Sequence, residues 1–173
     1  MNILITGKPR TGKTTLIKMI IKATSPACGG FYTEEIRRKG ERIGFMIKTT
    51  DGKEAPLAEK GLHTPHFIGK YGVHIANLDN IGVSAVEEAL GEKDFVIIDE
   101  IGKMELFSEK FRAVVMTALD SGKTVIGVIS LVNWPFLNAI RARPDVVILE
   151  VDGRNNEIVY RQVNELLPKA GKT

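Results

Sequence analysis

The segment from Gly7 to Thr14 contains residue types that can bind phosphate. It reads Gly-Lys-Pro-Arg-Thr-Gly-Lys-Thr and matches the pattern G-x-x-x-x-G-K-[ST] at every fixed position. A strand-like apolar run precedes it, and a stretch with helical periodicity follows it, as this motif requires. Glycines let successive backbone N–H groups turn toward phosphate oxygens, and the following helix adds its positive dipole end. The segment therefore predicts a phosphate-binding loop of the P-loop type.

Each side chain that follows the second glycine of this loop has a distinct expected task. We expect the Lys13 ammonium to lie between the β- and γ-phosphates of a nucleoside triphosphate. The Thr14 hydroxyl is a hard oxygen ligand for the Mg²⁺ that bridges the same phosphates, and Thr15 is placed to reach the α-phosphate. The predicted nucleotide-binding residues of the loop are Gly7, Lys8, Pro9, Arg10, Thr11, Gly12, Lys13, Thr14 and Thr15.

Two carboxylates follow a second apolar run, at residues 95–98. Asp99 is expected to hold Mg²⁺ through a water, completing the metal site that Thr14 begins, while Glu100 polarises the attacking water. Alone, this pattern is equally typical of a strand that ends in two solvated acids. A P-loop needs an acid from a second strand for its metal, so the loop favours the catalytic interpretation. Lys13 and Glu100 are thus the predicted catalytic residues.

Several cations could stabilise charge on the γ-phosphate. Lys103 follows the acidic pair and is a candidate γ-phosphate contact, although a solvated loop lysine fits the sequence equally well. Further candidates for stabilising transition-state charge are Arg10, Arg37, Arg38 and Arg112. The sequence alone does not choose among them.

Short apolar runs alternate with helical periodicity, which predicts an α/β fold: a mostly parallel sheet with helices on both faces. We expect strands at residues 2–6, 94–99, 124–129 and 145–151. We expect helices from about 13 to 25, at 84–91, at 107–120, at 134–142 and at about 159–167. Ser84 and Glu87 form a capping-box pattern that predicts the start of the second helix.

The segment from Gly29 to about Leu57 has a different pattern, typical of an antiparallel meander with turns at Lys39-Gly40 and Asp51-Gly52. The meander could extend the edge of the main sheet or form a flap over the ligand. Residues 60–80 are expected to be a long connection with one short strand near Val73 to Ala76.

Composition narrows the classes of protein. Lys and Arg number 24 against 21 Asp and Glu, so the net charge of +3 is too small to indicate a nucleic-acid-coating surface. A lone cysteine, Cys28, is typical of a reducing compartment, and we expect a cytoplasmic protein. The sequence has no export signal, no apolar run able to span a bilayer and no linker. We therefore expect a single domain over residues 1–173, without a membrane partner and monomeric.

The sequence resembles the small P-loop nucleoside-triphosphatases of hyperthermophilic microbes and their animal relative, the cancer-related nucleoside-triphosphatase. The resemblance covers most of the chain and is carried by the phosphate loop, by residues 29–37 with 42–45, and by residues 98–106. It implies a RecA- or AAA-like core that hydrolyses the β–γ bond of ATP, GTP and other nucleoside triphosphates with little base selectivity. Independently, the sequence lacks the [NT]-K-x-D pattern that reads guanine. Arg10 stands where the family loop commonly has glycine.

Two alternatives to a free-standing hydrolase remain open at this level. A small nucleotide or metabolite kinase would use the same loop, with Arg141-Ala142-Arg143 as the one candidate lid segment. A nucleotide-gated switch would hydrolyse slowly until a partner bound. The acidic pair at Asp99 and Glu100 favours the hydrolase over the kinase.

Overall fold

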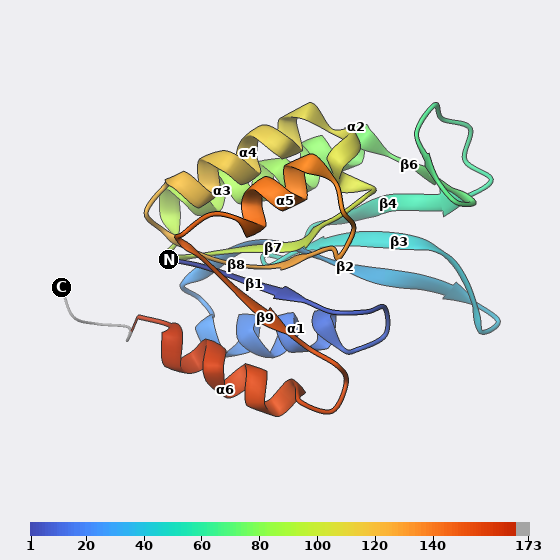
Figure 1. Cartoon of the computed structure of the whole chain (residues 1–173). Helices are drawn as coiled ribbons and strands as arrows, with labels where there is room; N and C mark the ends of the chain where they lie inside the picture. The colour runs from blue at the N-terminus through green and yellow to red at the C-terminus, as the bar shows by residue number, and fades with distance from the viewer. Residues whose placement is uncertain (169–173) are drawn as a thin grey trace.

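The structure is a computed structural model that describes residues 1–168. Within these residues, nine strands form one sheet in the order β5-β6-β4-β3-β2-β7-β8-β1-β9 (Figure 1). The strands are Asn2–Thr6 (β1), Cys28–Arg38 (β2), Glu41–Thr49 (β3), Glu54–Lys60 (β4), Phe67–Ile68 (β5), Tyr71–Val73 (β6), Phe95–Ile101 (β7), Thr124–Ile129 (β8) and Val146–Glu150 (β9). The α-helices are Lys13–Thr24 (α1), Ile75–Asn77 (α2), Ser84–Glu92 (α3), Glu109–Asp120 (α4), Pro135–Arg141 (α5) and Asn156–Leu166 (α6).

The parallel part of the sheet consists of β2, β7, β8, β1 and β9. Every residue of β1 is buried, because the strand is flanked by β8 and β9 and covered by helices on both faces. Such double burial explains why this strand and β8 read as continuous apolar runs rather than alternating ones. The prediction of a mostly parallel α/β sheet is confirmed.

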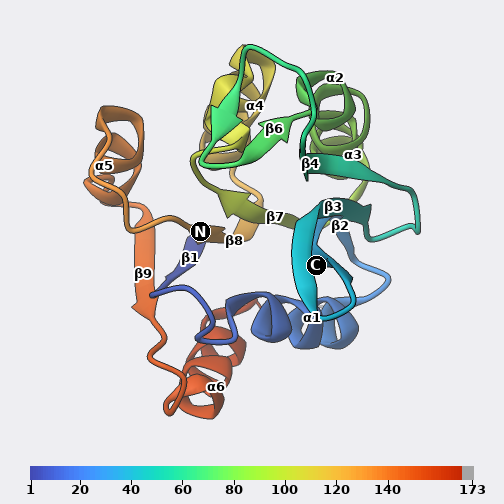
Figure 2. The ribbon, with the colours of Figure 1, turned by 90° about the vertical axis from the view of Figure 1, so that its right-hand side faces the viewer.

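Helices cover both faces of the sheet (Figure 2). Helices α1 and α6 lie on one face and α2 to α5 on the other (Figure 1). Residues alternate between the two cores along β1: Ile3 and Ile5 pack with α1, whereas Leu4 packs with the opposite cluster around Phe111 and Val115. No helix within residues 1–168 has the length and apolar character needed to cross a bilayer.

The register of the parallel strands brings the two predicted site segments to one edge of the sheet. Ile3 of β1 and Ile97 of β7 both pair with Ile126 of β8, which lies between them. Residues just beyond Ile3 and Ile97 along their strands therefore emerge at the same carboxyl edge, where ligands bind in open α/β sheets. One of these segments is the loop before α1, and the other contains Asp99.

The antiparallel meander both extends the sheet and projects beyond it. The first part of β2, Cys28–Phe31, pairs with β7 in parallel, whereas its continuation to Arg38 pairs only with β3. Because β2 and β7 run in the same direction, the unpaired half of β2 passes beyond the carboxyl edge of the main sheet. The meander therefore extends the main sheet, as one of the two expected arrangements had it. Its projecting part also forms one side of the region where ligands bind, close to the expected flap.

The connection between β4 and α3 is more ordered than the sequence predicted. It contains β5, β6, α2 and a π-helix, Leu78–Val83, which runs directly into α3. The predicted capping box at Ser84 is wrong, since the Ser84 hydroxyl donates to the Asp79 carbonyl and makes no cap for α3. A helix that continues from a preceding helical turn has no free N-terminal N–H groups to cap.

Candidate active site

The phosphate loop connects β1 to α1 and requires glycine at two positions. A Cβ atom on Gly7 would lie 2.4 Å from the carbonyl oxygen of Val151. Gly12 is the N-cap residue of α1, with a φ of 85°, in the left-handed region that side chains disfavour. The two glycines allow the tight turn that directs the loop into the start of the helix.

Lys13 folds back over this loop. Its Nζ donates to the carbonyl oxygens of Gly7 at 2.8 Å and Lys8 at 2.7 Å. Burial lowers the pKa of Lys13, and the nearby carboxylates of Glu100 and Asp99 act in the opposite direction. The ammonium is thus held at the loop and close to acidic groups, where an anionic ligand would replace its carbonyl partners.

The two residues predicted to bind the metal, Thr14 and Asp99, are hydrogen-bonded to each other. Thr14 Oγ1 donates to Asp99 Oδ2 at 2.9 Å, and Asp99 is only 1% exposed. Burial, with the charge of Glu100 next in size, raises the pKa of Asp99 to about 7, against the opposing hydrogen bond from Thr14. Because burial makes ionisation of Asp99 unfavourable, a cation bound beside it would strongly stabilise the ionised carboxylate.

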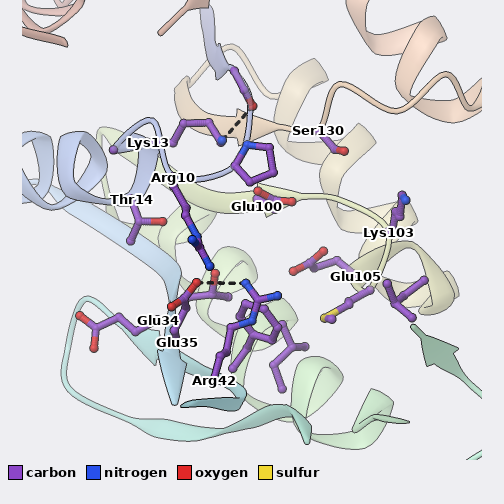
Figure 3. A pocket seen from close by; sticks show the side chains of 18 of the residues that line it. Arg10, Lys13, Thr14, Glu34, Glu35, Arg42, Glu100, Lys103, Glu105 and Ser130 are labelled. Carbon is purple, nitrogen blue, oxygen red and sulfur yellow. Dashed lines mark hydrogen bonds and ion pairs between the residues drawn. The ribbon is translucent and has the colours of Figure 1, made fainter. Parts of the chain in front are cut away.

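Two further carboxyl groups lie beside this pair. Burial raises the pKa of Glu100, and the Lys13 ammonium opposes this shift. Glu105 is 3% exposed, and burial together with the Glu100 charge raises its pKa well above the ordinary value. Its side chain points toward the same space as Glu100 (Figure 3). Glu105 lies within the segment 98–106 that carries the family resemblance, but the sequence reasoning assigned it no role in the site, because a charged residue is ordinarily assigned to the surface.

A cavity of about 840 Å³ opens beside the phosphate loop, and most of the predicted site residues line it (Figure 3). The predicted residues that line it are Gly7, Pro9, Arg10, Gly12, Lys13, Thr14, Thr15, Glu100 and Lys103. Three predicted residues lie outside its lining. Asp99 is buried behind Thr14, whereas Lys8 and Thr11 contribute backbone carbonyls that accept hydrogen bonds, from Lys13 and from Asn156 respectively.

Asn156, at the start of α6, supports the loop from behind. Its Nδ2 donates to the Thr11 carbonyl at 2.7 Å, and a Cβ on Gly12 would come within 2.6 Å of the same nitrogen. This contact joins residues 145 positions apart. The sequence contained no signal for it, since neither the motif nor a local periodicity links the two segments.

The structure separates the candidate arginines. Arg10 lines the cavity and adopts a φ of 64°, uncommon for a residue with a side chain. The other candidates lie outside the cavity lining: Arg37 pairs with Glu35, Arg38 is exposed, and Arg112 donates to the Leu106 carbonyl. An arginine that the sequence did not single out, Arg42, also lines the cavity.

The candidate lid segment is held in place by its own contacts. Arg141 donates to the carbonyl oxygens of Ser130 and Val132. Arg143 pairs with Asp120 and Asp145, at 2.7 Å in each case. Both guanidinium groups are thus engaged in fixing α5 and the start of β9, and neither lines the cavity.

The donors at Thr14 and Asp99 fit a magnesium ion that keeps waters and phosphate oxygens as its other ligands. Mg²⁺ commonly binds through one or two protein oxygens and substrate phosphates rather than through an all-protein cage. Among residues 1–168, no group of three or more His, Cys, Asp or Glu is placed to hold a metal by itself. The residues that fit the ion are the Thr14 hydroxyl and the buried Asp99 carboxylate, which are hydrogen-bonded to each other.

Fold and site together define a P-loop nucleoside-triphosphatase: a phosphate loop after β1, and an acidic pair on β7, separated from β1 by β8. The family model described as NTPase matches residues 2–164, and the chain belongs to this family. The resemblance inferred from the sequence is thereby confirmed.

Curated relatives and solved structures agree with this assignment. The chain is 49% identical over 167 residues to nucleoside-triphosphatase THEP1 of Thermotoga sp. (strain RQ2), covering 96% of this chain and 95% of that protein. The crystal structure of THEP1 from Aquifex aeolicus superposes with a TM-score of 0.89 at 36% identity, covering 98% of this chain and 100% of that one. A solution structure of a human cancer-related nucleoside triphosphatase gives a TM-score of 0.80 at 31% identity, with 99% of each chain covered.

Proposed function

We propose that this protein hydrolyses the β–γ bond of nucleoside triphosphates in a Mg²⁺-dependent reaction. One observation carries the proposal: Lys13 and Glu100 line the same cavity, directly beside the bond between Thr14 and Asp99. A cation for the terminal phosphates, a metal-binding pair and a carboxylate base are the parts that this reaction needs.

Each of these groups has a role that its position supports. The loop amides and Lys13 bind the β- and γ-phosphates, and Thr14 with Asp99 positions the metal. Mg²⁺, when bound, neutralises charge that develops on the phosphate oxygens. Glu100 accepts a proton from the attacking water, a task for which a carboxyl pKa raised by burial is suited. Lys103, exposed at the rim of the cavity, is placed to contact the γ-phosphate.

A second cavity, of about 350 Å³, supports low base selectivity. It lies between α1 and α6, shares Gly12 and Thr15 with the large cavity, and is otherwise lined by Leu16, Met19, Asn156, Glu157 and Tyr160. We assign the nucleoside to this cavity, since the γ-phosphate side is the one with Lys13 and Glu100. Asn156 Nδ2 donates to the Thr11 carbonyl and Glu157 accepts from Arg161, whereas Asn156 Oδ1 is buried without a hydrogen-bond partner among residues 1–168. Leu16, Met19 and the Tyr160 ring make the rest of the lining mostly apolar, and apolar contact does not distinguish one base from another.

Arg10 is the arginine that we propose stabilises charge on the γ-phosphate. It makes no ion pair among residues 1–168, and Figure 3 shows it extending from the loop into the cavity. Replacing Arg10 by glycine is expected to lower kcat by roughly tenfold or more, because the negative charge of the γ-phosphate in the transition state loses one hydrogen-bond donor. Glycine adopts positive φ freely, so the loop backbone should be retained. Steady-state phosphate release measures the effect, with Arg38→Ala as the control arginine outside the cavity.

An Arg10→Gly protein with unchanged kcat would remove the arginine from the mechanism. A rise in KM with unchanged kcat would indicate that Arg10 binds ground state and transition state equally. Arg38 is exposed on β2 and does not line the cavity, so Arg38→Ala should keep both kinetic constants.

Product analysis tests the proposed reaction itself. Incubation with ATP, GTP, CTP or UTP and Mg²⁺ is expected to yield the diphosphate and inorganic phosphate in equal amounts, with kcat/KM values within about tenfold of one another. Chelation of Mg²⁺ should stop the reaction. Release of pyrophosphate and a monophosphate would contradict cleavage at the β–γ bond, and a strong preference for one base would contradict the assignment of the second cavity.

The lone cysteine supports a cytoplasmic location. Cys28 is buried at the start of β2, with its Sγ near the Ile21 carbonyl oxygen at 3.7 Å. A buried free thiol is stable in a reducing compartment, where no disulfide partner is required.

A further inference from the structure

The large cavity extends well beyond the residues that hold phosphate. One end is lined by the phosphate loop and Glu100, and the other by residues of the meander, of β5 and of the segment after β7. We call this second end the distal chamber and define it by Arg42, Phe45, Leu57, Ile68, Met104 and Glu105. Pockets of 300–1,000 Å³ bury most of a drug-sized organic molecule. At about 840 Å³, the cavity exceeds what a γ-phosphate, its metal and one water require.

The nucleoside of a bound triphosphate does not occupy the distal chamber when it lies in the second cavity, between α1 and α6. Gly12 and Thr15 line both cavities, so the loop lies between them. Lys13, Thr14 and Glu100 line only the large cavity, which identifies it as the γ-phosphate side. With the nucleoside between α1 and α6, the distal chamber faces the terminal phosphate and not the base.

The walls of the distal chamber suit a flat organic molecule. Four of its defining residues, Phe45, Leu57, Ile68 and Met104, are apolar. The Phe45 ring packs edge-to-face against Tyr71, with centroids 5.3 Å apart at 71°. Hydrolysis by water gains nothing from such an apolar wall, whereas a ring-containing ligand gains the free energy of burying its faces.

Polar groups of the chamber are fixed in place. The Arg42 guanidinium lies 5.1 Å from the Phe45 ring centroid, and it donates to the Tyr71 hydroxyl at 2.9 Å and to Glu35 Oε1 at 3.1 Å. Glu105 is 3% exposed and points into the cavity (Figure 3). A rigid guanidinium and a buried carboxyl group on an apolar wall can orient the heteroatoms of one ligand.

We propose that the distal chamber binds a second substrate, a ring-containing alcohol, and that its hydroxyl group accepts the γ-phosphoryl group. This inference rests on the proposed β–γ cleavage and adds an acceptor in place of water. The acceptor oxygen forms a bond to the γ-phosphorus while the bridging β–γ oxygen–phosphorus bond breaks. The electron pair of the broken bond leaves with the nucleoside diphosphate, and the hydroxyl proton passes to Glu100.

The test uses ATP radiolabelled on the γ-phosphate, with Mg²⁺ and a panel of alcohols. The ring-containing probes are pyridoxine, benzyl alcohol and the common nucleosides, and glycerol is the alcohol without a ring. Chromatography separates labelled phosphate esters from labelled inorganic phosphate. At least one ring-containing alcohol is expected to form an ester, at a ratio of ester to phosphate clearly above that for glycerol.

Two neighbouring residues of β5 provide a matched pair of variants. Ile68 lines the chamber, whereas Phe67 is 48% exposed and does not. Ile68→Trp is expected to fill the chamber and lower the ratio of ester to phosphate by about tenfold or more, whereas Phe67→Trp keeps the ratio. Met104→Trp, at another residue that defines the chamber, provides a second plug should Ile68→Trp fail to fold.

The outcomes separate this inference from the proposed function. Phosphate release without any ester from the panel overturns the acceptor chamber and leaves the hydrolase standing. Equal ester formation from glycerol and the ring-containing alcohols, or an ester ratio that neither plug lowers, also overturns it. Ester formation without phosphate release in water would instead overturn the hydrolase and support the chamber.

Discussion

Replacing Lys13 by alanine is expected to reduce kcat/KM for MgATP by roughly 10²–10³-fold, the cost of removing one preorganised donor from a transition-state charge. Lys13 is the residue whose ammonium lies at the loop, bonded to the Gly7 and Lys8 carbonyls. With a triphosphate bound, the same ammonium is expected to lie between the β- and γ-phosphate oxygens, so both binding and turnover weaken. Phosphate-release kinetics and calorimetric titration with a non-hydrolysable triphosphate measure the two effects.

The control for Lys13 is Lys22→Ala, an exposed lysine in the last turn of the same helix. It removes an equal charge from α1 without touching the cavity, so kcat/KM should stay within about twofold, as for an ordinary surface substitution. Full turnover in Lys13→Ala would show that the loop does not bind the scissile phosphates.

Glu100→Gln is expected to retain nucleotide binding and to lower kcat by about 10²-fold or more, because an amide cannot accept the proton from water. The side chain keeps its size and position beside Lys13, so the dissociation constant for MgATP should change little. Rapid-quench measurement of one turnover, together with a binding titration, separates the two quantities. Glu92→Gln, at an exposed position in α3, is the matched control.

Gly102 offers an independent way to move Glu100 without changing its charge. A Cβ on Gly102 would lie 2.4 Å from Glu100 Oε1, so Gly102→Ala must displace the carboxylate. The same loss of turnover in Gly102→Ala and Glu100→Gln would attribute the effect to the position of the carboxylate. Normal turnover in Glu100→Gln would exclude Glu100 as the base, whatever Gly102→Ala does.

The strands and the loop whose signals lie in neighbouring residues could be predicted from the sequence. β1 and β8 match the predicted residues 2–6 and 124–129 because both strands are buried on both faces, and a turn or loop marks each end. The phosphate loop was predictable for a similar reason, since its function depends on neighbouring residues in a fixed order. Helix α4, at Glu109–Asp120, likewise falls within the predicted range 107–120, and its buried residues recur at helical spacing.

Features that depend on long-range packing could not be derived in this way. Asn156 reaches the loop only because α6 lies beside α1, and Glu105 is buried only because the segment after β7 folds back toward the cavity. Choosing Arg10 over Arg37 required the contacts that engage Arg37 elsewhere. Ser84 misled the sequence reasoning because a cap pattern does not reveal whether a helix is already running before it.

The most direct measurement of the central claim is a crystal structure of the Glu100→Gln protein with MgATP bound. We predict the γ-phosphate on the loop amides within hydrogen-bonding distance of Lys13 Nζ, the metal beside Thr14 and Asp99, and the substituted side chain at position 100 facing the γ-phosphorus. The nucleoside should lie between α1 and α6. A triphosphate bound away from residues 7–14, or a γ-phosphate pointing away from residue 100, would contradict the account.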